Sequence, residues 1–174
     1  WATSNQQAAL AELCSEYAAH SQSGITRLLN GPTGERNSYA ILPREHVLCL
    51  AEVESDLLTQ LAAVLAVGSS AVLPQSELAK ALLARLPAEV QPRITLVADW
   101  TKDEVIFDAV LHHGDCDQLR DVCQQVAQRA GAIVGVQGLS QGETNIALER
   151  LVIERALSVN TAAAGGNASL MTIG

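Results

Sequence analysis

Several residue types that would point to particular functions are scarce in this 174-residue chain. It contains five aromatic residues and only two lysines, and its formal net charge is −8. A surface that stacks nucleic acid bases needs aromatic rings, and a face that binds phosphates needs positive charge. The composition therefore argues against nucleic acid binding by this segment and against direct contact with an anionic membrane surface.

The chain also lacks the patterns of a secreted or membrane protein. Its four cysteines, Cys14, Cys49, Cys116 and Cys123, form no C-x-x-C pair, and no secretory signal precedes them. We therefore expect free thiols in a cytoplasmic protein. No apolar run reaches the length of a membrane span. Because the chain begins at Trp1 without a methionine, we expect it to be a piece of a longer protein.

Hydrophobic residues make up 48% of the chain, enough for a core of its own. Their spacing predicts strands alternating with helices, punctuated by glycine or proline. The expected strands are 38–42, 47–51, 71–73, 94–97, 109–112 and 132–136, and the expected helices are 54–67, 77–86 and 117–130. This alternation predicts an α/β fold with a Rossmann-like, doubly wound, mostly parallel sheet.

The two ends of the chain follow other patterns. Ser4 and Gln7 have the spacing of a capping box and predict a helix in the first thirty residues. Residues 148–157 alternate apolar with charged positions, which favours a β-flap, although periodicity alone leaves a helix open. We therefore expect four parts, namely an N-terminal helical segment (1–30), an α/β domain (31–147), a β-flap (148–157) and a C-terminal tail (158–174).

A Rossmann-like sheet raises the question of a dinucleotide site, and the chain has no G-x-G-x-x-G motif. Carboxylates stand at two of the strand-to-helix turns, where helix amides would meet a pyrophosphate. We expect Asp115, with Gln118 three residues later, to cap a helix and to fill that anion site.

Two other features resemble chemical sites. Cys116 lies at a helix N-terminus, but its neighbours Asp115 and Asp117 oppose a thiolate. His112 and His113 are adjacent on a strand and point to opposite faces, so they do not easily share one metal ion. We expect no metal site and no catalytic residue in this segment.

The chain resembles the C-terminal domain of the bacterial proline utilization A family. The resemblance is carried by residues 31–39, 42–45, 61–68, 148–157 and, most specifically, 158–174. It implies a degenerate version of the nucleotide-binding fold of aldehyde dehydrogenases. Where that fold has a ribose-binding lysine this chain has Leu73, and where it has a general base this chain has Gln137. No cysteine follows Cys123 to match its nucleophile. The resemblance thus implies no cofactor binding by this segment.

The resemblance also implies a parent enzyme that oxidises proline to glutamate. Such a parent uses FAD in a proline dehydrogenase and NAD in an L-glutamate γ-semialdehyde dehydrogenase, and it is cytoplasmic with peripheral association with the inner membrane. This segment is then a non-catalytic structural domain that helps to close the aldehyde dehydrogenase site and the substrate channel. The alternative is a stand-alone dinucleotide-binding domain with an atypical site.

The last seventeen residues carry no charge, although a free tail normally keeps itself soluble with charged residues. Their small side chains permit close backbone contact, so we expect a docking segment rather than a solvated tail. The expected docking residues are Asn160, Thr161, Ala162, Ala163, Ala164, Gly165, Gly166, Asn167, Ala168, Ser169, Leu170 and Met171. The expected partner is the aldehyde dehydrogenase domain of the same chain or of a partner chain, and the flap or the tail could also join two copies. A tail folded onto its own domain is the other alternative.

Overall fold

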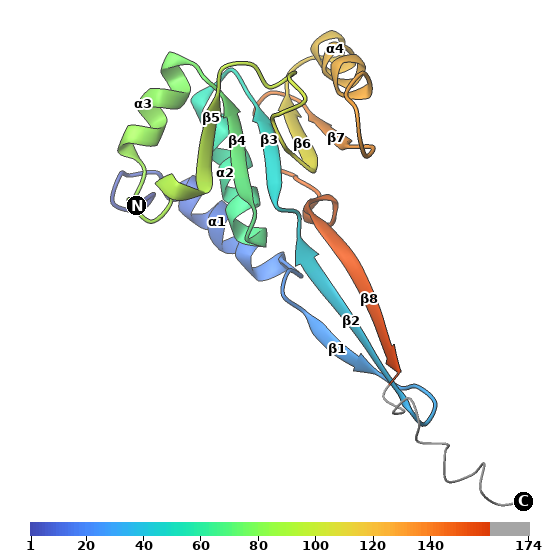
Figure 1. The fold of residues 1–174 in the computed structure, drawn as a ribbon. Coiled ribbons are helices and arrows are strands. Elements are labelled where there is room, and N and C mark those ends of the chain that lie inside the picture. Colours follow the sequence, from blue (N-terminus) through green and yellow to red (C-terminus); the bar gives the residue numbers. More distant parts are fainter. Residues whose placement is uncertain (161–174) are drawn as a thin grey trace, which may run out of the picture.

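A five-stranded parallel sheet forms the body of the molecule (Figure 1). The structure is a computed structural model, and it describes residues 1–160. The strands of the body are β3 (His46–Leu50), β4 (Ser70–Pro74), β5 (Ile94–Val97), β6 (Ala109–His113) and β7 (Gly135–Leu139). Their spatial order is β5-β4-β3-β6-β7, so the chain winds outward from β3 in both directions. The predicted doubly wound α/β fold is therefore confirmed.

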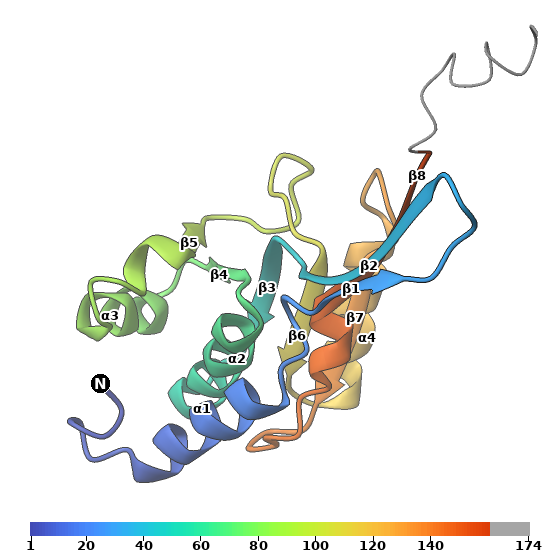
Figure 2. The same ribbon diagram turned by 90° about the horizontal axis from the view of Figure 1, so that it is seen from below.

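Helices cover both faces of this sheet (Figure 2). The chain forms α1 (Ala8–His20), α2 (Glu54–Val67), α3 (Glu77–Arg85) and α4 (Cys116–Ala127). Along β3 the side chains alternate, so that Val47 and Cys49 pack with α1, α2 and α3, whereas Leu48 packs with Val122 and Val126 of α4. Burial on both faces explains why β3 is apolar throughout.

The second sheet is an antiparallel arm that projects from the body (Figure 1). It consists of β1 (Thr26–Leu29), β2 (Glu35–Pro43) and β8 (Val152–Asn160), in the order β1-β2-β8. The expected flap is thus a strand, preceded by one 3₁₀ turn (Leu148–Leu151). The arm also joins residues on both sides of the boundary expected between 30 and 31, because β1 pairs with β2.

The expected N-terminal cap is wrong. The first helix begins at Ala8, and its N-cap Gln7 makes no side-chain capping hydrogen bond. Instead, the indole of Trp1 donates to the carbonyl of Arg85 at 2.7 Å, and the chain winds in turns from that anchor. Backbone amides of this turn, including that of Gln7, donate to the carbonyls of Trp1, Ala2 and Thr3, so the amides do not need the hydroxyl of Ser4.

Two boundaries at the far edge of the sheet also differ from expectation. Helix α4 ends at Ala127 rather than 130, and β7 begins at Gly135 rather than 132. The intervening segment turns through Gly131, whose φ is +107°, and leaves Ile133 fully exposed. The apolar residues there therefore belong to the turn and do not all enter the strand.

Within the described part of the chain, no helix is both long enough and apolar enough to cross a lipid bilayer.

Candidate functional site

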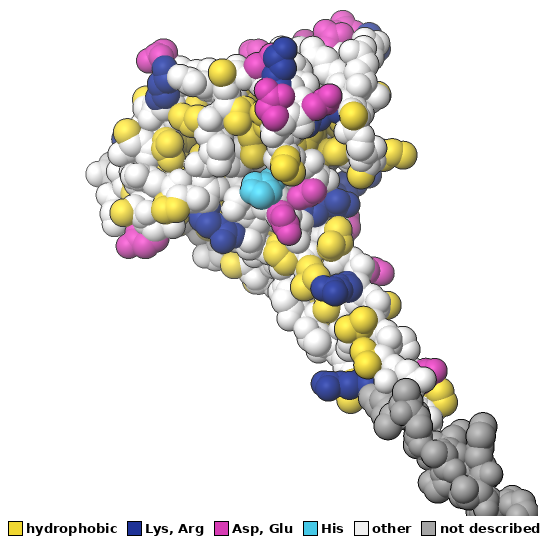
Figure 3. Space-filling model, viewed as in Figure 1, with side chains coloured by type: hydrophobic (Ala, Val, Ile, Leu, Met, Phe, Trp, Pro, Cys, Tyr) yellow, Lys and Arg dark blue, Asp and Glu magenta, His cyan; other side chains and the backbone are white. Residues whose placement is uncertain are grey.

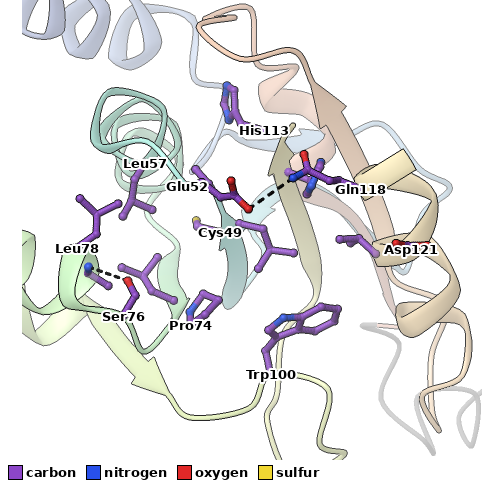
Figure 4. A pocket seen from close by; sticks show the side chains of 16 residues that line it. Cys49, Glu52, Leu57, Pro74, Ser76, Leu78, Trp100, His113, Gln118 and Asp121 are labelled. Carbon is purple, nitrogen blue, oxygen red and sulfur yellow. Dashed lines mark hydrogen bonds between the residues drawn. The ribbon is translucent and has the colours of Figure 1, made fainter. Parts of the chain in front are cut away.

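The main pocket lies where the carboxyl ends of β3 and β6 meet, at the point where the winding of the sheet changes direction (Figure 4). Its volume is about 530 Å³. Open α/β sheets bind ligands at such switch points. Its lining residues include Cys49, Leu50, Glu52, Leu57, Leu73, Pro74, Ser76, Leu78, Trp100, His112, Gln118, Asp121 and Val122.

Side chains cap two of the three helix N-termini near this pocket, those of α3 and α4, whereas the N-terminus of α2 has no side-chain cap. Asp115 caps α4 by accepting hydrogen bonds from the amides of Asp117 (2.9 Å) and Gln118 (2.8 Å), and Gln118 accepts one from the Asp115 amide at 3.0 Å. The cap predicted for Asp115 is therefore confirmed. Ser76 caps α3 in the same way by accepting a hydrogen bond from the Ala79 amide at 3.0 Å. Both termini thus use their own chain to satisfy the amides that a pyrophosphate would need.

The three residues expected to mark a lost cofactor site do not lie together. Leu73 is buried in the wall of the main pocket, and Asp115 borders a smaller neighbouring cavity. Gln137 lies beside a separate cavity of about 250 Å³, which Arg44 and Arg150 also line. The structure therefore has a pocket at the switch point of the sheet, and Gln137, the residue expected at the general-base position, does not line it.

The two adjacent histidines have different surroundings, as alternation along a strand requires. His113 Nδ1 is 2.8 Å from Gln60 Nε2, and its Nε2 is 2.8 Å from the carbonyl oxygen of Glu143. Because a carbonyl only accepts, Nε2 carries the proton and Nδ1 accepts from Gln60. His113 therefore joins β6, α2 and the loop that leads to the arm.

His112 has no such partners. Its side chain is buried, and its Nδ1 lacks a hydrogen bond within residues 1–160. Burial, followed by the nearby His113, lowers the pKa of His112, so its imidazole is neutral at pH 7. A buried polar atom without a partner is uncommon and usually has a structural or functional explanation.

The thiols divide into one buried and three exposed groups. Cys49 is buried in the main core, and burial raises the pKa of its thiol strongly. Cys116 is exposed at the first turn of α4, next to the capping carboxylate Asp115. No cluster of three or more histidine, cysteine or acidic side chains suited to a metal ion occurs among the described residues.

The arm has an apolar face that was not predicted from the sequence. Register pairs Leu28 with Ser38, Ser38 with Leu157, and Leu42 with Ile153, and paired residues share one face of an antiparallel sheet. We call Leu28, Leu42, Ile153, Leu157 and Val159 the apolar arm face. Four of them, all except Leu42, are between 43% and 69% exposed. Figure 3 shows apolar side chains along the arm with basic side chains between them.

Of the twelve residues expected to dock, only Asn160 lies within the described part, at the end of β8 opposite Glu35. The other eleven, residues 161–171, lie outside the described residues. The pairs Glu149–Arg150 and Glu154–Arg155 are exposed, which fits either a partner surface or the wet face of a strand.

Comparison with known proteins gives one consistent result. No protein-family profile matches the chain. The bifunctional protein PutA of Salmonella typhimurium is 60% identical over 166 residues, which are 95% of this chain and 13% of that protein. The Escherichia coli PutA is 57% identical over 174 residues, all of this chain and 13% of that protein.

Solved structures agree at the level of the fold. A Bradyrhizobium japonicum PutA mutant superposes with a TM-score of 0.56 at 20% identity, over 75% of this chain and 15% of that chain. A substrate-bound AldH from Staphylococcus aureus gives a TM-score of 0.50 at 18% identity, over 74% of this chain and 31% of that chain. This chain thus spans about 13% of the length of the curated relatives it matches.

Proposed function

Because the chain is homologous along nearly its whole length to a segment of bifunctional PutA proteins, we propose that it is a non-catalytic structural domain of such an enzyme. The parent would convert proline to glutamate with FAD in one active site and NAD in the other. The arm and the tail would pack on the aldehyde dehydrogenase region, in the same chain or in a partner chain. There they would close the active site and the channel between the two activities.

The non-catalytic part of this proposal is supported by the residues at the expected positions of the chemistry. Leu73 offers no charge to a ribose, and Gln137 cannot take a proton as a general base must. The exposed Cys116 lies beside Asp115, whose carboxylate opposes a thiolate nucleophile. We therefore assign this segment a supporting role in the parent enzyme, cytoplasmic like the parent.

The docking part rests on the apolar arm face, which is the observation that carries the proposal. Ile153, Leu157 and Val159 lie on one side of an outer strand, with Arg155 on the same side between Ile153 and Leu157, and more than 40% of each apolar side chain is exposed. Exposed apolar side chains gathered on one face mark contact surfaces, and burying each one contributes about 1.5–3 kcal/mol relative to full exposure. Within the described residues no further strand pairs with the outer edge of β1 or with that of residues 152–159 of β8, which allows a partner strand to add to the sheet.

The test uses the full-length enzyme with Leu157→Asp, and Ser158→Asp as the matched control. These neighbours are both exposed on β8 but point to opposite faces. A carboxylate in a docked apolar face loses the burial of leucine and adds a desolvation cost. We expect Leu157→Asp to lower semialdehyde oxidation at least roughly tenfold and to create a lag in NADH formation from proline. Ser158→Asp and the proline dehydrogenase step should stay near wild type.

The tail is tested by deleting residues 161–174 from the same enzyme. The deletion should act like Leu157→Asp, because both changes would open the same active site. Normal semialdehyde oxidation without a lag in both variants would overturn the proposal. Sedimentation of the same variants separates the two arrangements, since a change of mass accompanies lost activity only if docking occurs in a partner chain.

A further inference from the structure

The main pocket goes beyond the proposed docking role, because its chemistry is that of a ligand site. Its volume of about 530 Å³ is typical of small-molecule sites. The walls are mostly apolar, and a few polar groups converge on the space from β3, β6 and α4. We propose that this pocket binds an uncharged, hydroxylated heteroaromatic ligand of the nucleoside class and rejects the phosphorylated forms.

The charge of the rim decides against phosphate. Glu52 and Asp121 line the pocket, and among the described residues neither lysine nor arginine lines it. Figure 4 shows Glu52 and Gln118 on one side and Pro74 and Trp100 on the other. Two carboxylates near a phosphate repel it, and at α3 and α4 the caps Ser76 and Asp115 already accept from amides that a phosphate would use. The usual preference of a Rossmann site for nucleotides over nucleosides should thus be reversed.

The same carboxylate suits the hydroxyl groups of a ribose. Glu52 lies in the turn that follows the central strand β3 and is exposed, and its hydrogen bond with Gln118 Nε2 is long at 3.5 Å. A carboxylate oxygen pair can accept from two neighbouring hydroxyls, as the acidic residue of a dinucleotide site does. In this chain the acidic residue is Glu52, which follows the end of β3, where a dinucleotide site would hold a phosphate.

Two further side chains favour a flat, polar ring system. Trp100 lines the pocket and is held edge-to-face against Phe107 at 6.3 Å, so its indole is available in a fixed place for stacking. His112 is 94% buried, lines the pocket and has a nitrogen without a partner. The Nδ1 atom itself is enclosed by protein, so a ligand would contact the part of the ring that lines the pocket. The edge of a neutral imidazole suits a heteroaromatic partner, and this feature is independent of the rim charges.

The experiment is calorimetric titration of the 174-residue chain with adenosine, AMP and NAD. We expect saturable adenosine binding with a Kd below about 1 mM, and AMP and NAD binding at least roughly tenfold weaker. Glu52→Gln removes one of the two rim charges while keeping the shape of the side chain. It should therefore lower the affinity for adenosine and bring the affinities for adenosine and AMP to within about threefold of each other. Glu89→Gln, at an exposed site outside the pocket, should leave both affinities unchanged.

Fluorescence supplies a second readout that reports on the pocket alone. In Trp1→Phe the remaining tryptophan is Trp100, and adenosine should quench it with the calorimetric Kd. The absence of saturable adenosine binding up to about 10 mM overturns the proposal. Equal or tighter binding of AMP or NAD overturns it as well, in favour of the dinucleotide alternative. Neither outcome touches the docking role, which is tested at Leu157 in the full-length enzyme.

Discussion

Arg129 should be a major contributor to the stability of the body, although it lies outside the helices and strands. Its Nη1 donates to the carbonyls of Trp100 (2.8 Å) and Lys102 (2.7 Å), and its Nη2 donates to the carbonyl of Val105. Its guanidinium also lies over the ring of Phe107, 4.3 Å from the centroid. These contacts hold residues 98–108, which connect β5 to β6 and are the only connection between consecutive body strands in residues 46–139 that has no helix of its own.

The size of the effect follows from these contacts. Hydrogen bonds to charged groups contribute about 1.5–3 kcal/mol each, and a cation–π contact about 0.5–2 kcal/mol. The contacts share one side chain that is half-buried, so they do not add fully, and we expect Arg129→Ala to lower the free energy of unfolding by about 3 kcal/mol. For a chain of this length that corresponds to a fall in Tm of roughly 6–12 °C. Urea and thermal unfolding measure both values.

Arg129→Lys is the matched variant. It keeps the charge but replaces a planar fork by a single ammonium group, which cannot reach three carbonyls in the same geometry. It should therefore lose about half as much stability as the alanine variant, and Trp100 emission should shift in both. An Arg129→Ala protein within about 0.5 kcal/mol of wild type would refute this reasoning, because such a change is typical of an unconstrained surface residue.

Two further predictions concern titratable groups. In the native chain a thiol reagent should modify Cys116 and Cys123 quickly but Cys49 only after unfolding, because Cys49 is buried and its thiol pKa is raised. The exposed Cys14 should react more slowly than Cys116 and Cys123, because burial raises its thiol pKa too. Modification of Cys49 in the native chain as fast as that of Cys116 would contradict this. Burial lowers the pKa of His112 below its unfolded value of about 6.5, so the folded state binds fewer protons and stability should fall as pH drops below that value. His112→Gln should flatten the stability profile between about pH 6.5 and 5, and an unchanged slope would show that other groups cause it.

The body of the fold could be predicted because its local patterns agree with one another. Strand β5 and helix α2 have the predicted bounds, β6 and α3 differ from them by one residue at one end, and β3 and β4 by one residue at each end. Short apolar runs bounded by glycine or proline leave few alternatives. At the end of α2, for example, Gly68 adopts a φ of +88°, which stops the helix where the sequence indicates.

The arm could be predicted only in part, because its order comes from distant pairing. Strand β1 (Thr26–Leu29) is exposed along its whole length, so its four residues carry no burial pattern. It forms because Arg27 and Leu28 pair with Tyr39 and Ser38 of β2. The apolar arm face likewise depends on register, and register cannot be read from β1 or β8 taken singly.

In the candidate site, too, features that depend on nearby residues could be predicted, and features that depend on distant residues could not. The cap at Asp115 was predictable, since Gln118 lies three residues away in the sequence. The orphaned nitrogen of His112 and the clamp made by Arg129 were not, since each depends on packing between elements far apart in the chain. Sequence reasoning therefore predicted the local cap at Asp115 but not the contacts between elements that are distant in the chain.

The contacts behind the arm give a physical reason why a body without catalytic groups would persist in such an enzyme. Residues 140–151 connect the body to β8 of the arm, and three hydrogen bonds from the body hold this segment. Asp56 accepts from the Gly142 amide, His113 donates to the Glu143 carbonyl, and Tyr17 donates to the Thr144 carbonyl. All three anchoring side chains are buried, and they come from α2, β6 and α1. Buried polar contacts of this kind are costly to break, so the root of the arm is tied to the rigid core. We infer that the parallel sheet serves as a rigid base that orients the arm, a role that would keep the α/β fold intact if the proposed non-catalytic function holds.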